Sequence, residues 1–293
     1  MINGALIKER RKSLHISQKE LAKGITTQGT VSSLERNSTT LSSDILAKLL
    51  DKLSLSLKDV MTGDEKIDNQ RILHDADKQL MSYKYSEVLN TLNNVKETGN
   101  IEQKNHYIFL KTISETWIHK NYDDAIFGYN QILQEASTKT DIYSLLAMCE
   151  LGVVYAMKDD PKKSSFYFDQ LSPLLTDVNL NDHFFWSLMI LDNLSKYYSN
   201  IKRYDECLKI LREAISIAQR HNTPMFVDSF YFLYGTTLRD QNNKWSKDAL
   251  SYLLKSWAFA DFLGDSLVLK KAEKHLKEQG INLNFSFQDS SKK

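Results

Sequence analysis

The fold is decided by residues 17–37, which read SQKELAKGITTQGTVSSLERN. Ser17, with Glu20 three residues later, forms a capping-box pattern, and this pattern starts a short helix that carries Leu21 on its apolar side. Gly24 ends this helix at little cost, because glycine adopts the left-handed conformation readily. The stretch is therefore expected to begin with one short helix and a tight turn.

A second short helix is expected directly after the turn. Thr26 or Thr27 can cap it, and Val31 and Leu34 lie three residues apart, so both point into the domain. The opposite face carries short or amide side chains, which suit a helix laid against the edges of DNA bases. Any one of these residues alone is equally well explained as part of a solvated face. Only the whole set indicates a DNA reader.

The pattern S-Q-x-x-L-A, a short turn and V-S-x-L-E resembles the lambda-repressor-like (XRE) helix-turn-helix family. The resemblance implies that Gln18 lies at the DNA backbone. It also implies that Glu35 pairs with Arg11, which shares one face of the first helix with Ile7 and Leu14. The DNA-binding residues expected from this resemblance and from the helix face are Gln18, Thr27, Gln28, Gly29, Thr30, Ser32, Ser33, Arg36 and Asn37.

Two positions depart from the family pattern. Asn37 stands where many members have glycine, but asparagine tolerates the left-handed conformation, so the helix can still end there. Gly29 and Ser33 have little reach toward the bases. More of the specificity is therefore expected to come from DNA shape.

Length and charge indicate two domains. The chain has 293 residues, and residues 1–63 hold ten Lys and Arg against six Asp and Glu, a net charge of +4, while the remainder carries −3. The basic end is expected to be the DNA end. No apolar run approaches about 20 residues, and residues 1–12 do not read as a signal peptide, so no membrane contact and a cytoplasmic location are expected.

The N-terminal domain, residues 1–63, is expected to contain five helices. They are expected at residues 2–14, 17–23, 28–36, 42–53 and 56–61, and a linker at 62–66 follows. From residue 67 onward the pattern changes to paired amphipathic helices without strand signals. An aromatic residue followed by a small or β-branched one recurs as Tyr85/Val88, Tyr122/Ala125, a degenerate copy near Ser165, Tyr204/Cys207 and Trp245/Ala249.

This repeat resembles the tetratricopeptide repeat. In residues 191–218, Leu194, Ser195, Tyr198, Cys207, Leu211 and Ala214 fall at the spacings where that repeat places its helix-packing residues. The prediction is an all-α chain in which residues 67–284 form a right-handed solenoid of about five hairpins, with a helix at 266–279 capping the last hairpin. A plain helical bundle is the alternative. Residues 285–293 are expected to be a disordered tail.

The concave wall of such a solenoid is formed by the first helix of each hairpin. Asparagine can pair with the backbone of an extended peptide, and aromatic rings can hold its side chains. Tyrosine in a helical repeat, however, belongs to the core more often than to a ligand wall. The candidate peptide-binding residues are Glu150, Tyr155, Asn193, Lys196, Tyr197, Tyr231, Tyr234 and Arg239.

The combination of both parts resembles the Rgg/PlcR group of peptide-pheromone receptors of Gram-positive bacteria. The resemblance implies a homodimeric transcription regulator that reads a palindromic operator in double-stranded DNA and binds a short signalling peptide in quorum sensing. The alternatives are a dimeric repressor whose helical domain only dimerises or docks a protein partner, and a scaffold that has lost DNA affinity. No catalytic motif and no metal-ligand spacing around Cys149 or Cys207 is found, so neither an enzyme nor a cofactor is expected.

Overall fold

The computed structural model describes residues 2, 4–14, 16–36, 41–56, 60, 69–96, 100–136 and 138–283. These residues form α-helices and one 3-10 turn, Leu175–Asp177, and no strand is present among them. The chain divides into two compact units, which are Met1–Tyr83 with Asn90–Thr98, and Lys84–Leu89 with Gly99–Lys293. The all-α prediction is confirmed.

The first unit begins with four helices around one apolar core. They are α1 (Gly4–Ser13), α2 (Gln18–Ala22), α3 (Gln28–Glu35) and α4 (Ser43–Leu53). The core is made of Ile7, Leu21, Ala22, Val31, Leu34, Leu46, Leu49, Leu50, Leu53 and Val60. Apart from Ser56 and Val60, the expected fifth helix and the linker lie outside the described residues, as does the expected tail 285–293.

The two short helices of this unit start where the sequence places their caps. The Glu20 backbone N–H donates to Ser17 Oγ (3.1 Å) and the Ser17 N–H donates to Glu20 Oε2 (2.6 Å), so the capping box is complete. The Thr30 N–H donates to Thr27 Oγ1 at 3.2 Å and starts α3. These bonds satisfy backbone donors that a helix start leaves open, and they fix the turn between α2 and α3.

Lysine and arginine side chains bond the C-terminal ends of α2 and α4. Lys52 Nζ donates to the carbonyl oxygens of Glu20 (2.7 Å), Leu21 (3.3 Å) and Lys23 (3.2 Å) at the C-terminus of α2. Arg10 Nε donates to the carbonyl of Leu53 at the end of α4 (3.1 Å). Cations stabilise helix C-termini because the last carbonyls are unpaired and the helix dipole is negative there. Sequence patterns alone did not reveal either contact.

The helices α6 (Asn69–Met81) and α7 (Tyr85–Leu92) follow in the chain. Thr91 Oγ1 donates to Gln79 Oε1 at 2.9 Å, and the Asn69 side chain bonds the backbone of Lys96. Leu73, Ala76 and Leu80 form the buried stripe of α6.

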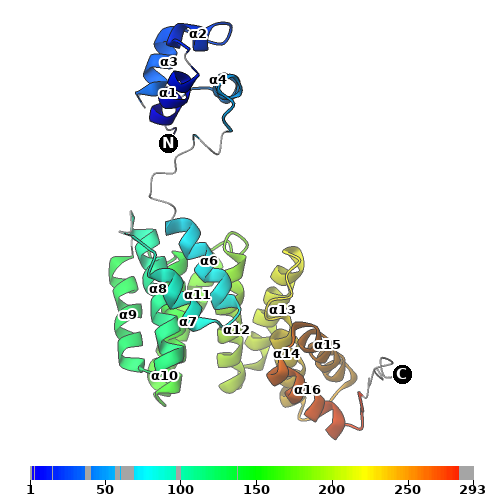
Figure 1. The fold of residues 1–293 in the computed structure, drawn as a ribbon. Helices are drawn as coiled ribbons and strands as arrows, with labels where there is room; N and C mark the ends of the chain where they lie inside the picture. The colour runs from blue at the N-terminus through cyan, green and yellow to red at the C-terminus, as the bar shows by residue number, and fades with distance from the viewer. Residues whose placement is uncertain are drawn as a thin grey trace, which may run out of the picture. The chain divides into compact units, whose positions relative to one another are not determined.

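The second unit is a stack of helical hairpins closed by one more helix (Figure 1). The hairpins are α8 (Ile101–His119) with α9 (Tyr122–Glu135), α10 (Ile142–Met157) with α11 (Pro161–Leu174), α12 (Phe184–Asn200) with α13 (Tyr204–Arg220), and α14 (Val227–Asn242) with α15 (Lys247–Leu263); α16 (Ser266–Glu278) packs on the last. The first helices pack on one another in the order α8, α10, α12, α14 and α16. This order is that of a helical repeat, not of a plain bundle. No described helix is long and apolar enough to cross a membrane.

Small residues let the two helices of a hairpin approach closely. Val88, Ala125, Cys207 and Ala249 are buried, as the repeat pattern predicts. In the third copy the buried small residue is Ser164, one position before the predicted Ser165. The reason is that Phe168, four residues after Ser164, fills the space over Gly152, where an added Cβ would lie 2.7 Å from the ring.

Gly235 on α14 offers a direct test of this close packing. A Cβ added there would lie 2.7 Å from the carbonyl oxygen of Ala249, a backbone atom that cannot turn away. Overpacking costs about 1–3 kcal/mol, and alanine recovers only about 1 kcal/mol of helix propensity. We therefore expect Gly235→Ala to lower the free energy of unfolding in urea. Gly29→Ala, also within a helix but without a contact below 3.8 Å, should be neutral or stabilising.

Candidate functional site

A chain of polar contacts runs from the core of the first unit to its surface. Arg11 Nε donates to Glu35 Oε1 (2.6 Å) and Arg11 Nη2 to Glu35 Oε2 (3.1 Å), so the pair implied by the family resemblance is formed. Gln18 Nε2 donates to the same carboxylate at 2.8 Å, and Gln28 Nε2 donates to Gln18 Oε1 at 2.9 Å. The buried ion pair thus fixes Gln18, which in turn holds the exposed Gln28 at the start of α3.

The Glu35 carboxylate stays ionised in this environment. Burial alone would raise its pKa, but hydrogen bonds from Arg11 and Gln18 and the Arg11 charge hold the pKa below its usual value. An ionised Glu35 accepts from Arg11 and Gln18 together. The orientation of Gln18, and through it that of Gln28, therefore depends on this charge.

The other predicted DNA-binding residues lie along α3 and its two ends. Gly29 is exposed. The hydroxyls of Thr27 and Thr30 form a hydrogen bond of 2.8 Å between their Oγ1 atoms. The Arg36 guanidinium bonds back to Ser32, with 3.2 Å from Nε to the carbonyl and 3.1 Å from Nη2 to Oγ. Ser33 is half-buried, and Asn37 lies outside the described residues. Arg36 is therefore turned along its own helix in the free protein.

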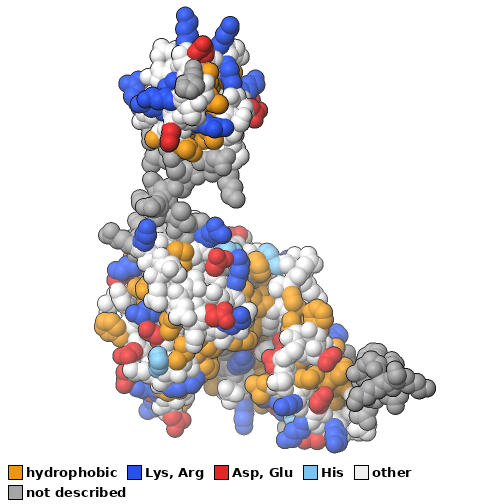
Figure 2. All heavy atoms as spheres, in the orientation of Figure 1, with side chains coloured by type: hydrophobic (Ala, Val, Ile, Leu, Met, Phe, Trp, Pro, Cys, Tyr) orange, Lys and Arg blue, Asp and Glu red, His pale blue; other side chains and the backbone are white. Residues whose placement is uncertain are grey.

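The surroundings of Gln28 are open and basic. An open hollow of about 800 Å³ is lined by Arg11, Ser17, Gln18, Lys19 and Gln28. Lys and Arg side chains are spread over the visible face of this unit (Figure 2). The exposed cations among its described residues include Lys8, Lys12, Lys19, Lys23 and Arg36. Cations around an amide-bearing helix suit a polyanion, because each can neutralise one backbone phosphate.

In the second unit, polar side chains of three consecutive first helices meet. Asn193 Nδ2 on α12 donates to Glu150 Oε1 on α10 at 3.1 Å. Ser229 Oγ on α14 donates to Asp192 Oδ1 at 2.8 Å, and Lys196 pairs with Asp192 one turn along α12. We call these five residues the inner polar network. Three of them, Glu150, Asn193 and Lys196, are among the predicted peptide-binding residues.

Asp192 and Ser229 were not predicted from the sequence. In the sequence, Asp192 and Lys196 are four residues apart, which is typical of a solvent-exposed ion pair on one helix face. Ser229 has neither a charge nor an aromatic ring that would mark it as a site residue. Only the packing of α12 against α14 joins them. A polar residue immediately before the predicted Asn193 was the one signal that could have pointed to Asp192.

The four predicted tyrosines do not join the network. Tyr155 stacks on Tyr167 of α11, with ring centroids 5.6 Å apart, and Tyr197 stacks on Phe168 of α11 at 4.4 Å. On α14, both remaining tyrosines pack against Tyr252 of α15, Tyr231 at 5.9 Å and Tyr234 at 4.1 Å. All four therefore lie against the second helices of hairpins.

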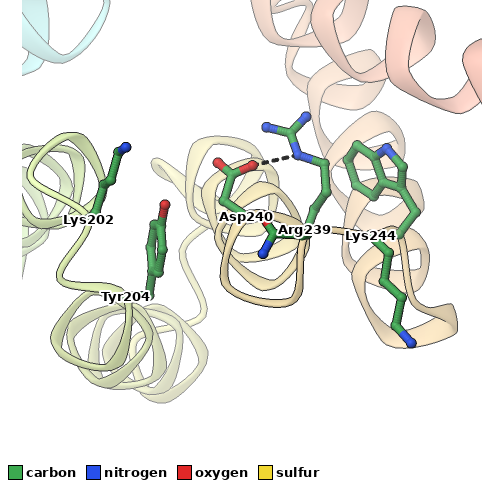
Figure 3. Close-up of a pocket in the computed structure, with 7 residues that line it drawn as sticks. Lys202, Tyr204, Arg239, Asp240 and Lys244 are labelled. Carbon is green, nitrogen blue, oxygen red and sulfur yellow. Dashed lines mark hydrogen bonds and ion pairs between the residues drawn. The ribbon is translucent and has the colours of Figure 1, made fainter.

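Arg239 lies at the C-terminal end of α14, apart from the network along its helix. Its Nε bonds Asp240 at 2.7 Å, and its guanidinium lies 5.0 Å from the centre of the Trp245 ring. It lies beside a hollow of about 480 Å³ that two hairpin turns border. Figure 3 shows the side chains that line this hollow. The hollow is lined by Lys202, Tyr204, Arg239, Asp240, Asn243, Lys244 and Trp245.

Comparison with known proteins agrees with this architecture. Residues 7–60 match the helix-turn-helix family model. None of the curated proteins compared with the chain matches it. Among solved structures, Bacillus thuringiensis PlcR in complex with the peptide PapR7 and DNA is 22% identical and has a TM-score of 0.62, with 96% of this chain and 98% of that chain covered.

A second solved structure, ComR from S. thermophilus in complex with DNA and its signalling peptide ComS, is 14% identical. Its TM-score is 0.53, and the match covers 94% of this chain and 99% of that one. At these identities the likeness concerns the fold. Residues 7–60 are therefore similar to the helix-turn-helix family, and the whole chain has the fold of PlcR and ComR.

Proposed function

We propose that the chain is a sequence-specific transcription regulator whose helical repeats bind a short signalling peptide, which in turn controls DNA binding or activation. In this proposal it acts in the cytoplasm as a homodimer, within the Rgg/PlcR group of Gram-positive bacteria. The observation that carries the peptide half is the inner polar network, because its five side chains come from three consecutive first helices. Such a row can bond the backbone of an extended peptide that crosses these helices.

The two solved relatives support both halves of this proposal. Each was solved with DNA and a peptide together, and each match covers more than nine-tenths of both chains. In the first unit, the Gln28 side-chain amide is held in place for contact with a base. Its bond to Gln18 and the ion pair of Arg11 and Glu35 behind Gln18 fix its orientation. The predicted DNA-binding residues remain the proposed contact set.

We expect full DNA affinity to require a dimer. One domain of this size reads a single half-site, and two domains about one helical turn apart read a palindrome. Sedimentation and gel-shift experiments on the full chain, using a duplex selected from a random library, measure both properties. A monomer that binds this duplex with full affinity would contradict the expectation.

The alternative is a dimeric repressor whose helical repeats dimerise or dock a protein partner and bind no peptide. One observation favours it, which is that every residue of α10 from Ile142 to Gly152 is buried. In this alternative Asn193 only braces α12 against α10 through Glu150. The two readings differ in what Asn193→Ala does to peptide affinity.

We expect Asn193→Ala to lower peptide affinity about tenfold or more. The change removes about two hydrogen bonds to the peptide backbone, each worth about 0.5–1.5 kcal/mol. It also removes the donor to Glu150, so a stability loss of about 1 kcal/mol is expected as well. Calorimetry on the folded protein, with short peptides that the wild-type chain retains from a random synthetic library, measures the affinity.

Asn130→Ala is the matched control, because Asn130 is a part-buried amide on α9 whose hydrogen bond, among the described residues, goes to its own helix at Ile126 (2.8 Å). It should leave peptide affinity unchanged. Lost stability with intact peptide affinity in Asn193→Ala would support the alternative, in which Asn193 is a brace.

A further inference from the structure

Three carboxylates are buried on the first helices of three consecutive hairpins in the second unit. Glu150 on α10 is 4% exposed, Asp192 on α12 is 4% exposed and Asp228 on α14 is 5% exposed. Asn193 donates to Glu150, and Ser229, next to Asp228 in sequence, donates to Asp192. The three acids therefore follow one another across adjacent helices, connected by side chains of the inner polar network.

The positive charge beside these acids is too small to balance them. Lys196 pairs with Asp192, and its side chain is 52% exposed. The same lysine is the cation that acts on Glu150, whose other neighbours, Tyr85, Tyr129 and Cys149, are neutral groups.

Asp228 lies in an acidic surrounding of its own. The backbone N–H groups of Ser229 and Asp228 donate to its carboxylate, but the charged groups that act on it are two further acids, Asp265 and Asp192. Buried carboxylates are stable when ionised only with a counter-charge or several donors. The network therefore lacks positive charge.

A buried hydroxyl also lies near Glu150. Tyr129 on α9 is fully buried, and its Oη makes no hydrogen bond of normal geometry within the described part of the chain. Burial first and the Glu150 charge second raise its pKa, so the hydroxyl lies within electrostatic reach of this carboxylate. Among the described residues, Thr116 is the hydrogen-bonding group that acts on this hydroxyl. Buried polar groups without a full hydrogen bond are rare.

We propose that the inner polar network binds a cationic group of the ligand, an ammonium or a guanidinium, at Glu150 and Asp192. This inference rests on the proposed peptide-binding function and names the chemistry of the peptide. The cation is either a lysine or arginine side chain or the free N-terminal amine, since both present N–H donors with a positive charge.

Glu150 and Asp192 distinguish ligand groups by their charge. A cation supplies donors to Glu150 and Asp192 and balances their charge, whereas a carboxylate would add to the imbalance. Lys196 does not block this exchange, because an i,i+4 pair with a half-exposed lysine is weak. A ligand cation therefore displaces Lys196 from Asp192, or competes with Lys196 for this carboxylate.

The test uses full-length protein and pools of short synthetic peptides that are identical except at one residue. One pool carries lysine there, a second acetyl-lysine and a third glutamate, and each is made with a free and with an acetylated N-terminus. Retention on the protein is read by mass spectrometry. The lysine pool, or the free-amine pools if the N-terminus is the cation, should be enriched about tenfold over the neutral pools.

Two variants separate this inference from a general loss of fold. Glu150→Gln should abolish the preference for the cationic pool over the neutral pool, so that the ratio of the two retained pools falls to about one. Lys196→Met should strengthen that preference, because it removes the competing cation. The two variants therefore change the preference in opposite directions, which a folding defect cannot do.

The remaining outcomes are distinct. Peptides retained without charge preference, or with preference for glutamate, overturn this inference and leave the proposed function standing. If no pool is retained at all, both fail. A preference for lysine that survives Glu150→Gln unchanged also contradicts the assignment to this network.

Discussion

Arg11→Ala is expected to lower the free energy of unfolding of the first unit by about 3 kcal/mol, because it leaves Glu35 buried without its counter-charge. The Glu35 side chain is 2% exposed, and Arg11 makes two bonds to it and a third, at 2.7 Å, to the carbonyl of Ile16. Amide hydrogen exchange of α1 to α3 in the full chain measures the loss. Glu35→Ala should act in the same direction.

Arg36→Ala is the matched control for this substitution. Its guanidinium is exposed and, within the described part of the chain, bonds Ser32 of its own helix, so the variant should leave exchange in the core of the first unit nearly unchanged. Equal protection in Arg11→Ala and wild type would show that the pair contributes nothing. A loss in both arginine variants would show that general charge, not the buried pair, is responsible.

The second large effect concerns pH and Glu150. Burial raises the pKa of Glu150 to about 7 from its ordinary value of 4.5, with Lys196 and Asn193 opposing the shift. Between these two values the folded chain binds a proton that the unfolded chain releases. Stability therefore falls as pH rises through this window, by about 3 kcal/mol in total at 1.36 kcal/mol per unit.

Glu150→Gln removes the carboxyl group and with it this fall of stability with rising pH. We expect the variant to match wild type near pH 5 and to exceed its stability at pH 8, by up to about 3 kcal/mol in urea unfolding. Asp228, whose pKa burial raises to about 6, remains in the variant and keeps part of the decline. Glu102→Gln, at an exposed site on α8, should follow wild type throughout. Parallel curves for wild type and Glu150→Gln would contradict the account.

Local patterns predicted much of the fold. The capping box at Ser17 and the buried small residues at Ala125 and Cys207 follow from contacts within a few residues or from a fixed repeat, so they could be found in the sequence. The copy near Ser165 was placed one residue late. The choice between Ser164 and Ser165 depends on how Phe168 packs over Gly152, which the sequence does not specify.

The candidate site was less accessible to sequence reasoning. Asn193 and Glu150 can be recognised in the sequence as polar residues on first helices, but their bond depends on how α10 and α12 cross. Tyr197 and Tyr234 carry the same pattern as groove residues, yet both pack against second helices, because a tyrosine can bury its ring and keep its hydroxyl bonded. Ring direction is set by tertiary packing, so residue type alone could not assign it.

The central claim is that a peptide bound by the helical repeats controls DNA binding. The direct measurement is the affinity of the full chain for its selected duplex, at one salt concentration, with and without the peptides that the wild-type chain retains. The account predicts that these peptides change the DNA affinity of wild type and leave that of Asn193→Ala nearly unchanged at the same peptide concentration. No change in wild type, or an equal change in both proteins, would contradict it.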